Sequence, residues 1–347
     1  MDRRKFPSPP ADRRRKSAQS RPPVPLSTAM TEMMIKQVQE LRASLLAYRV
    51  IANRLSTTLD YDVLPNHINI LLFGPSGSGK SSLIRTFYLG LHNISQLPSD
   101  VSQKIVVKGT DRNEGTTRFS SIVLKAETQE RTEKGERTTS GVIVHDTRGQ
   151  IWMDSKEAAQ LGMVLQGKVK DMSLVEQRNH RYAYMLWEFW RKDHDLFPQE
   201  ILKTRSGLSE KPHCLIFVFD GSLEEIPNGP EEVQFYRDIF QLARDRGYYY
   251  PQVVLTRVDK VEEIVDRSSE EGEQRLRELL DLKIESVVMK LGIPRSSVHF
   301  VENYHDGSRR QDLEVDFHAL RLLHEAVQQS DSYLQSQLRE KKTCELQ

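Results

Sequence analysis

The 347-residue sequence has little cysteine and lacks long apolar runs. Its two cysteines, Cys214 and Cys344, are too few for a disulfide framework and fit a reducing compartment. No stretch approaches the roughly 20 apolar residues that a membrane-spanning helix needs. The N-terminal region also lacks the apolar core of a signal peptide. We therefore expect a cytoplasmic protein.

The sequence also lacks an excess of either charge, because 50 Lys and Arg residues face 49 Asp and Glu residues, a net charge of +1. This balance gives no clear indication of a nucleic-acid site. Hydrophobic residues make up 37% of the chain, which is enough to bury a sizeable core. The composition predicts a globular protein.

The first 28 residues differ from the rest, because they combine Pro, Ser and Arg with almost no large apolar side chains. Residues 1–28 are expected to form a disordered basic tail. The stretch 4–10 contains a PxxP pattern typical of a ligand for an SH3-type domain; the alternative is a tail without a binding role.

Residues 29–56 follow the tail. Their apolar side chains from Met34 to Leu55 recur at steps of four and three, which predicts an amphipathic helix. That helix would pack onto the next domain or form a coiled-coil seam.

A phosphate-loop pattern runs over residues 74–81, between an apolar run and a helical pattern, as this motif requires. The backbone N–H groups of such a loop and the ammonium of Lys80 can bind phosphate oxygens, and the hydroxyl of Ser81 can ligate Mg²⁺. The sequence therefore predicts nucleotide binding. The expected phosphate-binding residues are Gly74, Ser76, Gly77, Ser78, Gly79, Lys80, Ser81 and Ser82.

After this loop, apolar runs alternate with helical segments, which is typical of an α/β domain with a mainly parallel sheet. We expect a P-loop NTPase fold of the G-domain type over residues 65–310, with flanking helices and a helical insertion at about 154–210. A C-terminal helix and tail would cover residues 311–347, and the polar stretch 128–137 would form a hairpin-like connection. The expected strands are 67–73, 119–126, 141–146, 213–220, 251–256 and 297–302, and the expected helices are 80–92, 231–246, 269–291 and 313–338.

A DxxG element, Asp146 to Gly149, follows the third expected strand. The carboxylate of Asp146 can hold Mg²⁺ and the N–H of Gly149 can contact a γ-phosphate. Gln150 stands where small GTPases orient the attacking water, so it is either a catalytic residue or a surface residue. Upstream, Thr117 is our first choice and Thr116 our second for completing the metal coordination, unless both only enter the next strand.

The end of the fifth expected strand carries Thr256, Arg257 and Asp259, a variant of the N/TKxD element. A carboxylate at Asp259 can accept hydrogen bonds from two donors of guanine that adenine lacks. The planar guanidinium of Arg257 can stack on a base. After the last strand, Asn303 and Tyr304 are candidates for backing the base.

Beyond these elements the chain resembles the interferon-induced protein 44 family of P-loop GTPase-like proteins. The similarity extends over residues 65 to 338. It also rests on Lys211–Ser222, Leu165–Asp171, Lys290–Ile293 and the run Glu302-Asn303-Tyr304. It implies a G domain in a cytoplasmic protein linked to immune or stress responses.

Two features depart from that resemblance. The family tends to place an apolar residue where this chain has Gln150. The run Gly115–Arg118 is similar to the Era and TrmE GTPases, a second affiliation, but their RNA-binding accessory domains have no evident counterpart here.

The motifs together predict a GTP-binding protein that hydrolyses GTP slowly to GDP and phosphate with Mg²⁺ and acts as a nucleotide-dependent switch. In this interpretation Lys80, Gln150 and Thr117 are catalytic, and Ser81, Thr117 and Asp146 hold the metal. One alternative is a pseudo-GTPase scaffold that binds partners through its tail and helices, and another is an ATP-dependent nucleotide kinase. A nucleotide-dependent homodimer or effector complex would form through the switch segments 110–118 and 147–153 with the adjoining helical insertion.

Overall fold

The computed structural model describes residues 28–50, 64–105, 119–131, 137–147, 149–150, 153–171, 201–263, 265, 270–304 and 312–345. The predicted tail falls outside this range except for its last residue, and Thr116 and Thr117 fall outside it altogether. None of the helices in the described residues has both the length and the apolar character that a membrane span requires.

A six-stranded sheet with the order β2-β3-β1-β4-β5-β6 forms the centre of the structure. Its strands are β1 (Ile68–Phe73), β2 (Ser120–Arg131), β3 (Arg137–Asp146), β4 (Cys214–Asp220), β5 (Gln252–Thr256) and β6 (Val298–Val301). All neighbouring strands pair in parallel except β2 and β3, which pair antiparallel at one edge. The expected mixed α/β fold with a mainly parallel sheet is confirmed.

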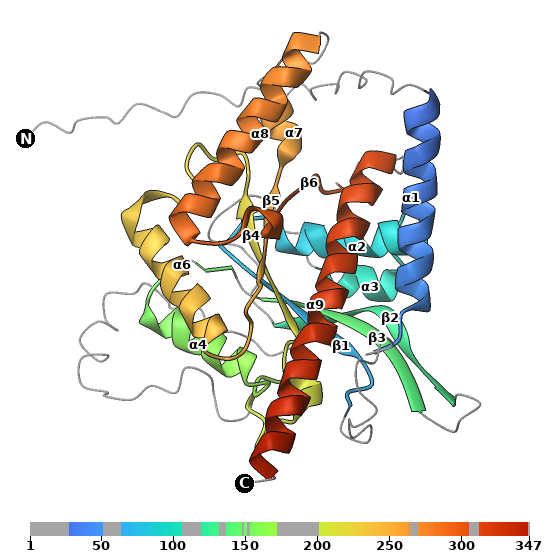
Figure 1. The fold of residues 1–347 in the computed structure, drawn as a ribbon, viewed down its shortest axis with the longest axis vertical. Coiled ribbons are helices and arrows are strands. Elements are labelled where there is room, and N and C mark those ends of the chain that lie inside the picture. Colours follow the sequence, from blue (N-terminus) through green and yellow to red (C-terminus); the bar gives the residue numbers. More distant parts are fainter. Residues whose placement is uncertain are drawn as a thin grey trace, which may run out of the picture.

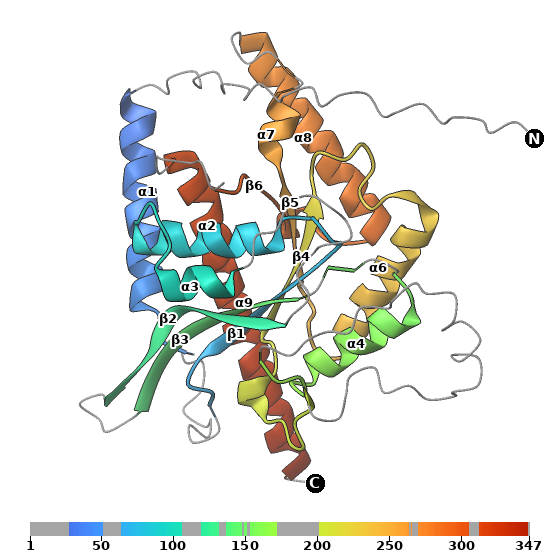
Figure 2. The same ribbon diagram turned by 180° about the vertical axis from the view of Figure 1, so that it is seen from behind.

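Helices cover both faces of this sheet (Figures 1 and 2). On one side lie α1 (Thr28–Ala47), α2 (Lys80–His92), α3 (Ser99–Lys104) and α9 (Leu313–Glu345). On the other side lie α4 (Ser155–Leu165), α6 (Gly229–Arg244) and α8 (Glu270–Leu291), while the short α7 (Val258–Glu262) follows β5. Short 3₁₀ turns occur at Leu208–Glu210 and Arg295–Ser297.

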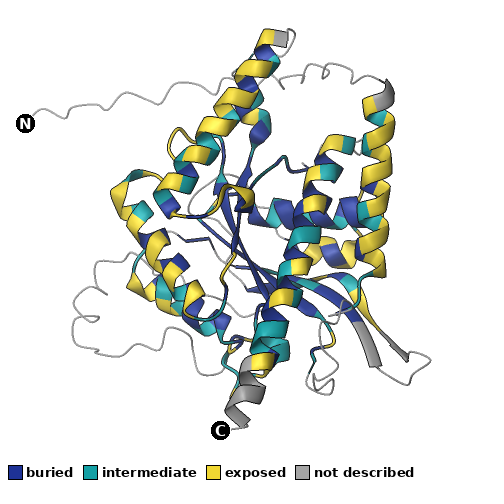
Figure 3. Cartoon of the chain, in the orientation of Figure 1, coloured by how far each residue is buried: buried dark blue, intermediate teal, exposed yellow. Residues whose placement is uncertain are grey.

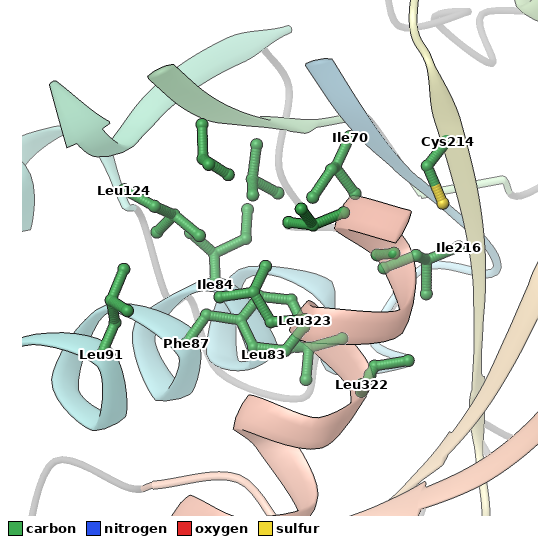
Figure 4. Close-up of a cluster of buried hydrophobic side chains, with 14 of the residues drawn as sticks. Ile70, Leu83, Ile84, Phe87, Leu91, Leu124, Cys214, Ile216, Leu322 and Leu323 are labelled. Carbon is green, nitrogen blue, oxygen red and sulfur yellow. The ribbon is translucent and has the colours of Figure 1, made fainter. Parts of the chain in front are cut away.

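The central strands are mostly apolar because both of their faces are covered. Every residue of β1 and of β5 is buried, and Figure 3 shows the same for the interior of the sheet. Successive residues of a strand point to opposite faces, so Ile70 and Leu72 join the cluster under α2 and α9 while Leu71 and Phe73 join the cluster under α4 and α6. Figure 4 shows the first cluster, where Phe87 of α2 and Leu323 of α9 meet the sheet.

The N-terminal helix packs onto the domain through its apolar stripe, which decides between the two predicted roles of that stripe. Val38 and Leu45 are buried with α2 and α9 in the first cluster, and Leu41 is partly buried against it. The helix ends at Ala47, earlier than the predicted end near residue 56. Side-chain donors satisfy the last carbonyl oxygens there, because Lys125 Nζ donates to Tyr48 O (2.6 Å) and the Arg49 guanidinium donates to Ala47 O (3.2 Å).

Other boundaries differ by a few residues for local reasons. Strands β2 and β3 extend into the predicted connection 128–137, since their antiparallel pairing continues to the pair Arg131 and Arg137. In the predicted insertion, α4 is followed by an antiparallel bridge between Val169 and Leu202. The aromatic residues between 182 and 190 lie outside the described residues.

Candidate nucleotide-binding site

The phosphate loop connects β1 to α2 at the carboxyl edge of the sheet, which is where ligands bind in open α/β folds. Gly79 precedes α2 with φ of +92°, a left-handed conformation that favours glycine. A Cβ atom at Gly79 would lie 3.0 Å from Nδ2 of Asn303. The loop is therefore packed closely against the segment that follows β6.

Lys80, the first residue of α2, is buried beneath this loop with 5% of its surface exposed. Its ammonium donates hydrogen bonds to the carbonyl oxygens of Gly74 and Pro75, both at 2.8 Å. Burial lowers the pKa of Lys80 to about 8, against the opposing effect of the carboxylates of Asp146 and Glu157. The structure thus holds a cation at the floor of the loop, where phosphate oxygens would lie.

Asp146, the last residue of β3, faces the same point. The hydroxyl of Ser81 donates to its Oδ2 at 2.5 Å. Its Oδ1 is buried and, among the described residues, has no hydrogen-bond partner. Burial raises the pKa of Asp146, while Lys80 and the Ser81 hydroxyl oppose this rise. Lys80, Ser81 and Asp146 form what we call the phosphate cluster, and its unpartnered oxygen beside a hydroxyl fits the oxygen ligands that Mg²⁺ prefers.

The DxxG element is packed directly on the phosphate loop. The backbone of Gln150 pairs with the loop through Ser76 N to Gln150 O (3.0 Å) and Gln150 N to Gly74 O (3.2 Å). A Cβ atom at Gly149 would lie only 2.3 Å from Cα of Ser76, so glycine is needed for this approach. Gln150 is 7% exposed, and its side-chain oxygen accepts from the N–H of Gly74 at 2.9 Å. The side chain predicted to orient water is here a partner of the loop backbone.

Two residues at the end of β5 are bonded to the phosphate loop. Thr256 Oγ1 donates to the carbonyl of Ser78 at 2.7 Å. The guanidinium of Arg257 donates to Gly77 O (2.7 Å) and to the carboxylate of Asp220 (2.5 Å). These bonds fix the end of β5 against the loop.

Asp259, Asn303 and Tyr304 differ in how the structure places them. Asp259 lies in α7 directly after β5, beside the loop-bound residues. Asn303 Nδ2 lies 3.4 Å from Gly79 O, so it borders the site. The hydroxyl of Tyr304 points instead to the start of α9, where it donates to Asp316 Oδ1 at 2.9 Å. The side chain of Tyr304 therefore points away from the phosphate loop, and a contact of Tyr304 with a base stays a prediction.

Sequence reasoning missed Asp220 and Glu157. Asp220 ends a buried strand, as Asp146 does, so the same position rule could have found it. Glu157 is buried in the first turn of α4 and accepts from the backbone N–H of Met153 at 2.7 Å. Its effect on Lys80 depends on packing between distant segments, which no local pattern contains. Thr117, the predicted metal ligand, lies outside the described residues, as does Arg148 of the DxxG element.

A second polar group lies on the face of the sheet that α4 and α6 cover. We call it the histidine cluster, and it consists of His145, His213 and Asn69. His145 bonds Ser121 Oγ (2.8 Å) and Asn69 Oδ1 (3.0 Å). His213 accepts from Asn69 N and donates to Leu208 O, both at 2.9 Å. Burial lowers the pKa of His145 to about 3 and that of His213 to about 4. Both imidazoles are therefore neutral, beside a cavity of about 270 Å³ that is lined by His145 and Asn69.

The strand order with one antiparallel edge strand, together with the phosphate loop between β1 and α2, defines a P-loop fold of the GTPase type. At the sequence level, the chain is similar to interferon-induced protein 44. It is 28% identical over 282 residues to the protein of Pan troglodytes and 28% identical over 281 residues to that of Homo sapiens. The matches cover 80% of this chain and 54% of each relative, so the chain spans about half the length of the curated relatives it matches. The predicted resemblance is confirmed at this level.

No family model matches the chain. Among solved structures, it is similar to Toc33 from Arabidopsis thaliana in complex with GDP and Mg²⁺, with a TM-score of 0.35 and 10% identity, over 87% of this chain and 92% of that one. It is also similar to the bacterial selenocysteine-specific elongation factor EF-Sec, with a TM-score of 0.31 and 14% identity, over 78% of this chain and 29% of that one.

Proposed function

We propose that this chain binds GTP and GDP together with Mg²⁺. The observation that carries the proposal is the phosphate cluster, in which a buried lysine, a hydroxyl and a carboxylate with one unpartnered oxygen meet beneath a phosphate loop. A buried oxygen without a partner is costly, and a bound cation would satisfy it.

In this proposal, Lys80 and the loop amides bind the phosphates, while Ser81 and Asp146, with Thr117 as a third candidate, hold the metal. The metal ion would neutralise charge on the β- and γ-phosphates. Gly74, Ser76, Gly77, Ser78, Gly79 and Ser82 would line the phosphates, and Gly149 would approach the γ-phosphate.

Isothermal titration tests this first step. We expect Mg²⁺-dependent binding of GDP and GTP that Lys80→Ala strongly weakens, with ATP failing to compete. Absence of guanine-nucleotide binding by the folded wild-type chain would end the proposal.

Guanine selection is proposed for Asp259, supported by the bonds that fix β5, Thr256 and Arg257 to the loop beside it. The carboxylate would accept from two donors of the base, and Asp259→Asn should shift preference toward xanthine nucleotides because the amide supplies a donor. Competition between GTP and XTP measures this shift. An unchanged preference would mean that another residue reads the base.

Slow hydrolysis of GTP and a switch role form the finer part of the proposal. A pseudo-GTPase scaffold is the second candidate, and the packing of Gln150 against Gly74 N favours it. Phosphate release measured over a range of protein concentrations separates the two. Release no faster than in buffer, with GTP bound, would leave only the scaffold.

Partners and location complete the proposal. Loops that contact a γ-phosphate present a surface in one nucleotide state only, so we propose GTP-dependent binding to a second copy or an effector. Light scattering with GDP and with a non-hydrolysable GTP analogue tests this, and equal monomer masses in both would exclude the dimer.

Three further properties are proposed from the sequence. The tail sequence supports an SH3-type ligand, the composition supports a cytoplasmic location, and the similarity to interferon-induced protein 44 supports a role in immune responses.

A further inference from the structure

A series of polar contacts runs from the N-terminal helix to the phosphate loop. It begins at Arg42 of α1, whose guanidinium donates to Asp316 Oδ2 of α9 at 3.1 Å and to Gly90 O of α2 at 2.8 Å. The other oxygen of Asp316 accepts from the hydroxyl of Tyr304 at 2.9 Å. One side chain of α1 thus bonds to both α2 and α9. These two helices lie beside α1 (Figures 1 and 2).

The series continues through Thr86 and Asn303. The backbone N–H of Tyr304 donates to Thr86 Oγ1 of α2 at 3.0 Å. The hydroxyl of Thr86 donates to Ser82 O at 2.9 Å and lies in contact with Asn303 Oδ1 at 3.3 Å. Nδ2 of Asn303 then lies 3.4 Å from Gly79 O in the phosphate loop. Tyr304 therefore anchors the residue beside it, which borders the candidate site.

Asp316 and Tyr304 are buried and Arg42 is partly buried, so each depends on its partner. The side chains of Arg42 and Asp316 are 16% and 5% exposed. Burial raises the pKa of Asp316, against the effects of the Tyr304 hydroxyl and the Arg42 guanidinium. Removal of one partner leaves a buried polar group unsatisfied, which costs more than the bond itself contributes. Arg42 and Tyr304 should consequently act together rather than independently.

We propose that Arg42, Asp316 and Tyr304 are positioning residues that hold loop 302–304 against the phosphate loop, so that docking of α1 and binding of guanine nucleotide favour each other. This inference rests on the proposed function for its ligand. It gives α1, which lies outside the sheet, a role in nucleotide retention. Because coupling between two binding events is reciprocal, nucleotide should also strengthen the docking of α1.

The chain offers a matched control for a purely structural role. The hydroxyl of Tyr48, just after α1, donates to Asp331 of α9 at 2.6 Å. This Tyr–Asp bond also joins the N-terminal segment to α9, but Asp331 lies about four helical turns from Asp316 along α9 and Tyr48 has no described bond to the loop. Tyr48→Phe therefore matches Tyr304→Phe in chemistry and differs in position.

The test measures dissociation of fluorescent mant-GDP in Mg²⁺ from the full chain. Arg42→Ala and Tyr304→Phe should each speed dissociation about 3- to 10-fold, the size of one lost hydrogen bond of ordinary strength. In the double variant, mant-GDP should dissociate more slowly than it would if the two single effects multiplied. Tyr48→Phe should stay within about twofold of wild type. If Arg42→Ala does not fold, Arg42→Lys should speed dissociation by a smaller factor. Lysine keeps the positive charge, but it cannot donate to Gly90 O and Asp316 Oδ2 in the geometry of the guanidinium.

Hydrogen exchange of the nucleotide-free chain supplies a second readout. The amide of Tyr304 should exchange faster in Arg42→Ala than in wild type and at the wild-type rate in Tyr48→Phe. Wild-type dissociation and exchange in Arg42→Ala would overturn the inference. Failure of the wild-type chain to bind any guanine nucleotide would instead overturn the proposed function, and the exchange rates alone would then decide whether Arg42 positions the loop.

Discussion

The phosphate cluster and the histidine cluster receive neighbouring residues of β3, Asp146 and His145, whose side chains point to opposite faces of the sheet. Both clusters are buried and both join distant parts of the chain. In the histidine cluster, every imidazole nitrogen has a hydrogen-bond partner and the rings are neutral. In the phosphate cluster, two charged groups are buried and one carboxylate oxygen has no partner among the described residues.

This difference separates a structural polar group from a ligand site. A buried group with satisfied hydrogen bonds needs nothing more, whereas an unsatisfied one indicates that an ion or ligand completes it. The cavity beside the histidine cluster does not change this interpretation, because the imidazoles and the Asn69 side chain that border it already have partners. Substitutions in the phosphate cluster should therefore change nucleotide affinity, and substitutions in the histidine cluster should change the stability of the fold.

The largest effect is expected for Lys80→Ala. Loss of the ammonium removes charge-assisted hydrogen bonds to phosphate, so GDP affinity should fall about 100- to 1,000-fold. Titration calorimetry measures the affinity, and circular dichroism checks that the variant is folded. GDP affinity within threefold of wild type would place the phosphates elsewhere and remove the distinction between the clusters.

The histidine cluster should determine stability in acid. The pKa of His213 is about 4 in the folded chain and near 6.5 when unfolded, so the unfolded chain binds the proton first as pH falls. The contribution of the neutral ring to stability is complete above pH 6.5 and is lost as pH falls toward 4, amounting to about 2 kcal/mol between pH 7 and pH 5. Urea unfolding at both pH values should show a smaller loss for His213→Gln than for wild type. Equal losses would mean that His213 is not protonated on unfolding in this range.

Asp146→Asn should have an intermediate effect. The amide keeps the shape of the side chain and removes its charge, so GDP affinity in Mg²⁺ should fall about tenfold or more, toward the affinity of wild type in EDTA. GDP affinity with and without Mg²⁺ measures this change. A variant with full Mg²⁺ dependence would assign the metal to other residues.

The smallest effect is expected for Gln150→Ala. Its side-chain oxygen accepts from Gly74 N, so its loss should lower the free energy of unfolding by about 1 kcal/mol and alter GTP turnover only a few-fold. Single-turnover phosphate release tests this. A decrease of 100-fold or more would show that Gln150 acts in catalysis from another position.

The sheet and its helices were largely predictable because each is specified by local sequence. Strands β1, β4 and β5 are short apolar runs bounded by turn residues, and α2 follows a phosphate loop that allows few other conformations. The end of α1 was not predictable, since the apolar spacing continues to Leu55 while Lys125, distant in the sequence, binds the carbonyl of Tyr48.

The candidate site was predictable in its members more than in its contacts. Motifs identified Lys80, Ser81 and Asp146, because their order along the chain fixes their place at one edge of the sheet. They did not predict that Gln150 pairs with Gly74, that Arg257 binds Asp220, or that Tyr304 turns to α9. Those contacts join elements that are far apart in sequence, and only the packed fold brings them together.

Helix α9 closes the first apolar cluster, and its place after all six strands of the sheet has a consequence for biosynthesis. Its side chains Leu320 and Leu323 complete the cluster that contains Val38 and Leu45 of α1. Chains emerge from the ribosome N-terminus first, at about 5–20 residues per second. Helix α1 therefore leaves the ribosome before α9 is made, and until α9 follows, the apolar face that α9 covers is open to chaperones and to aggregation.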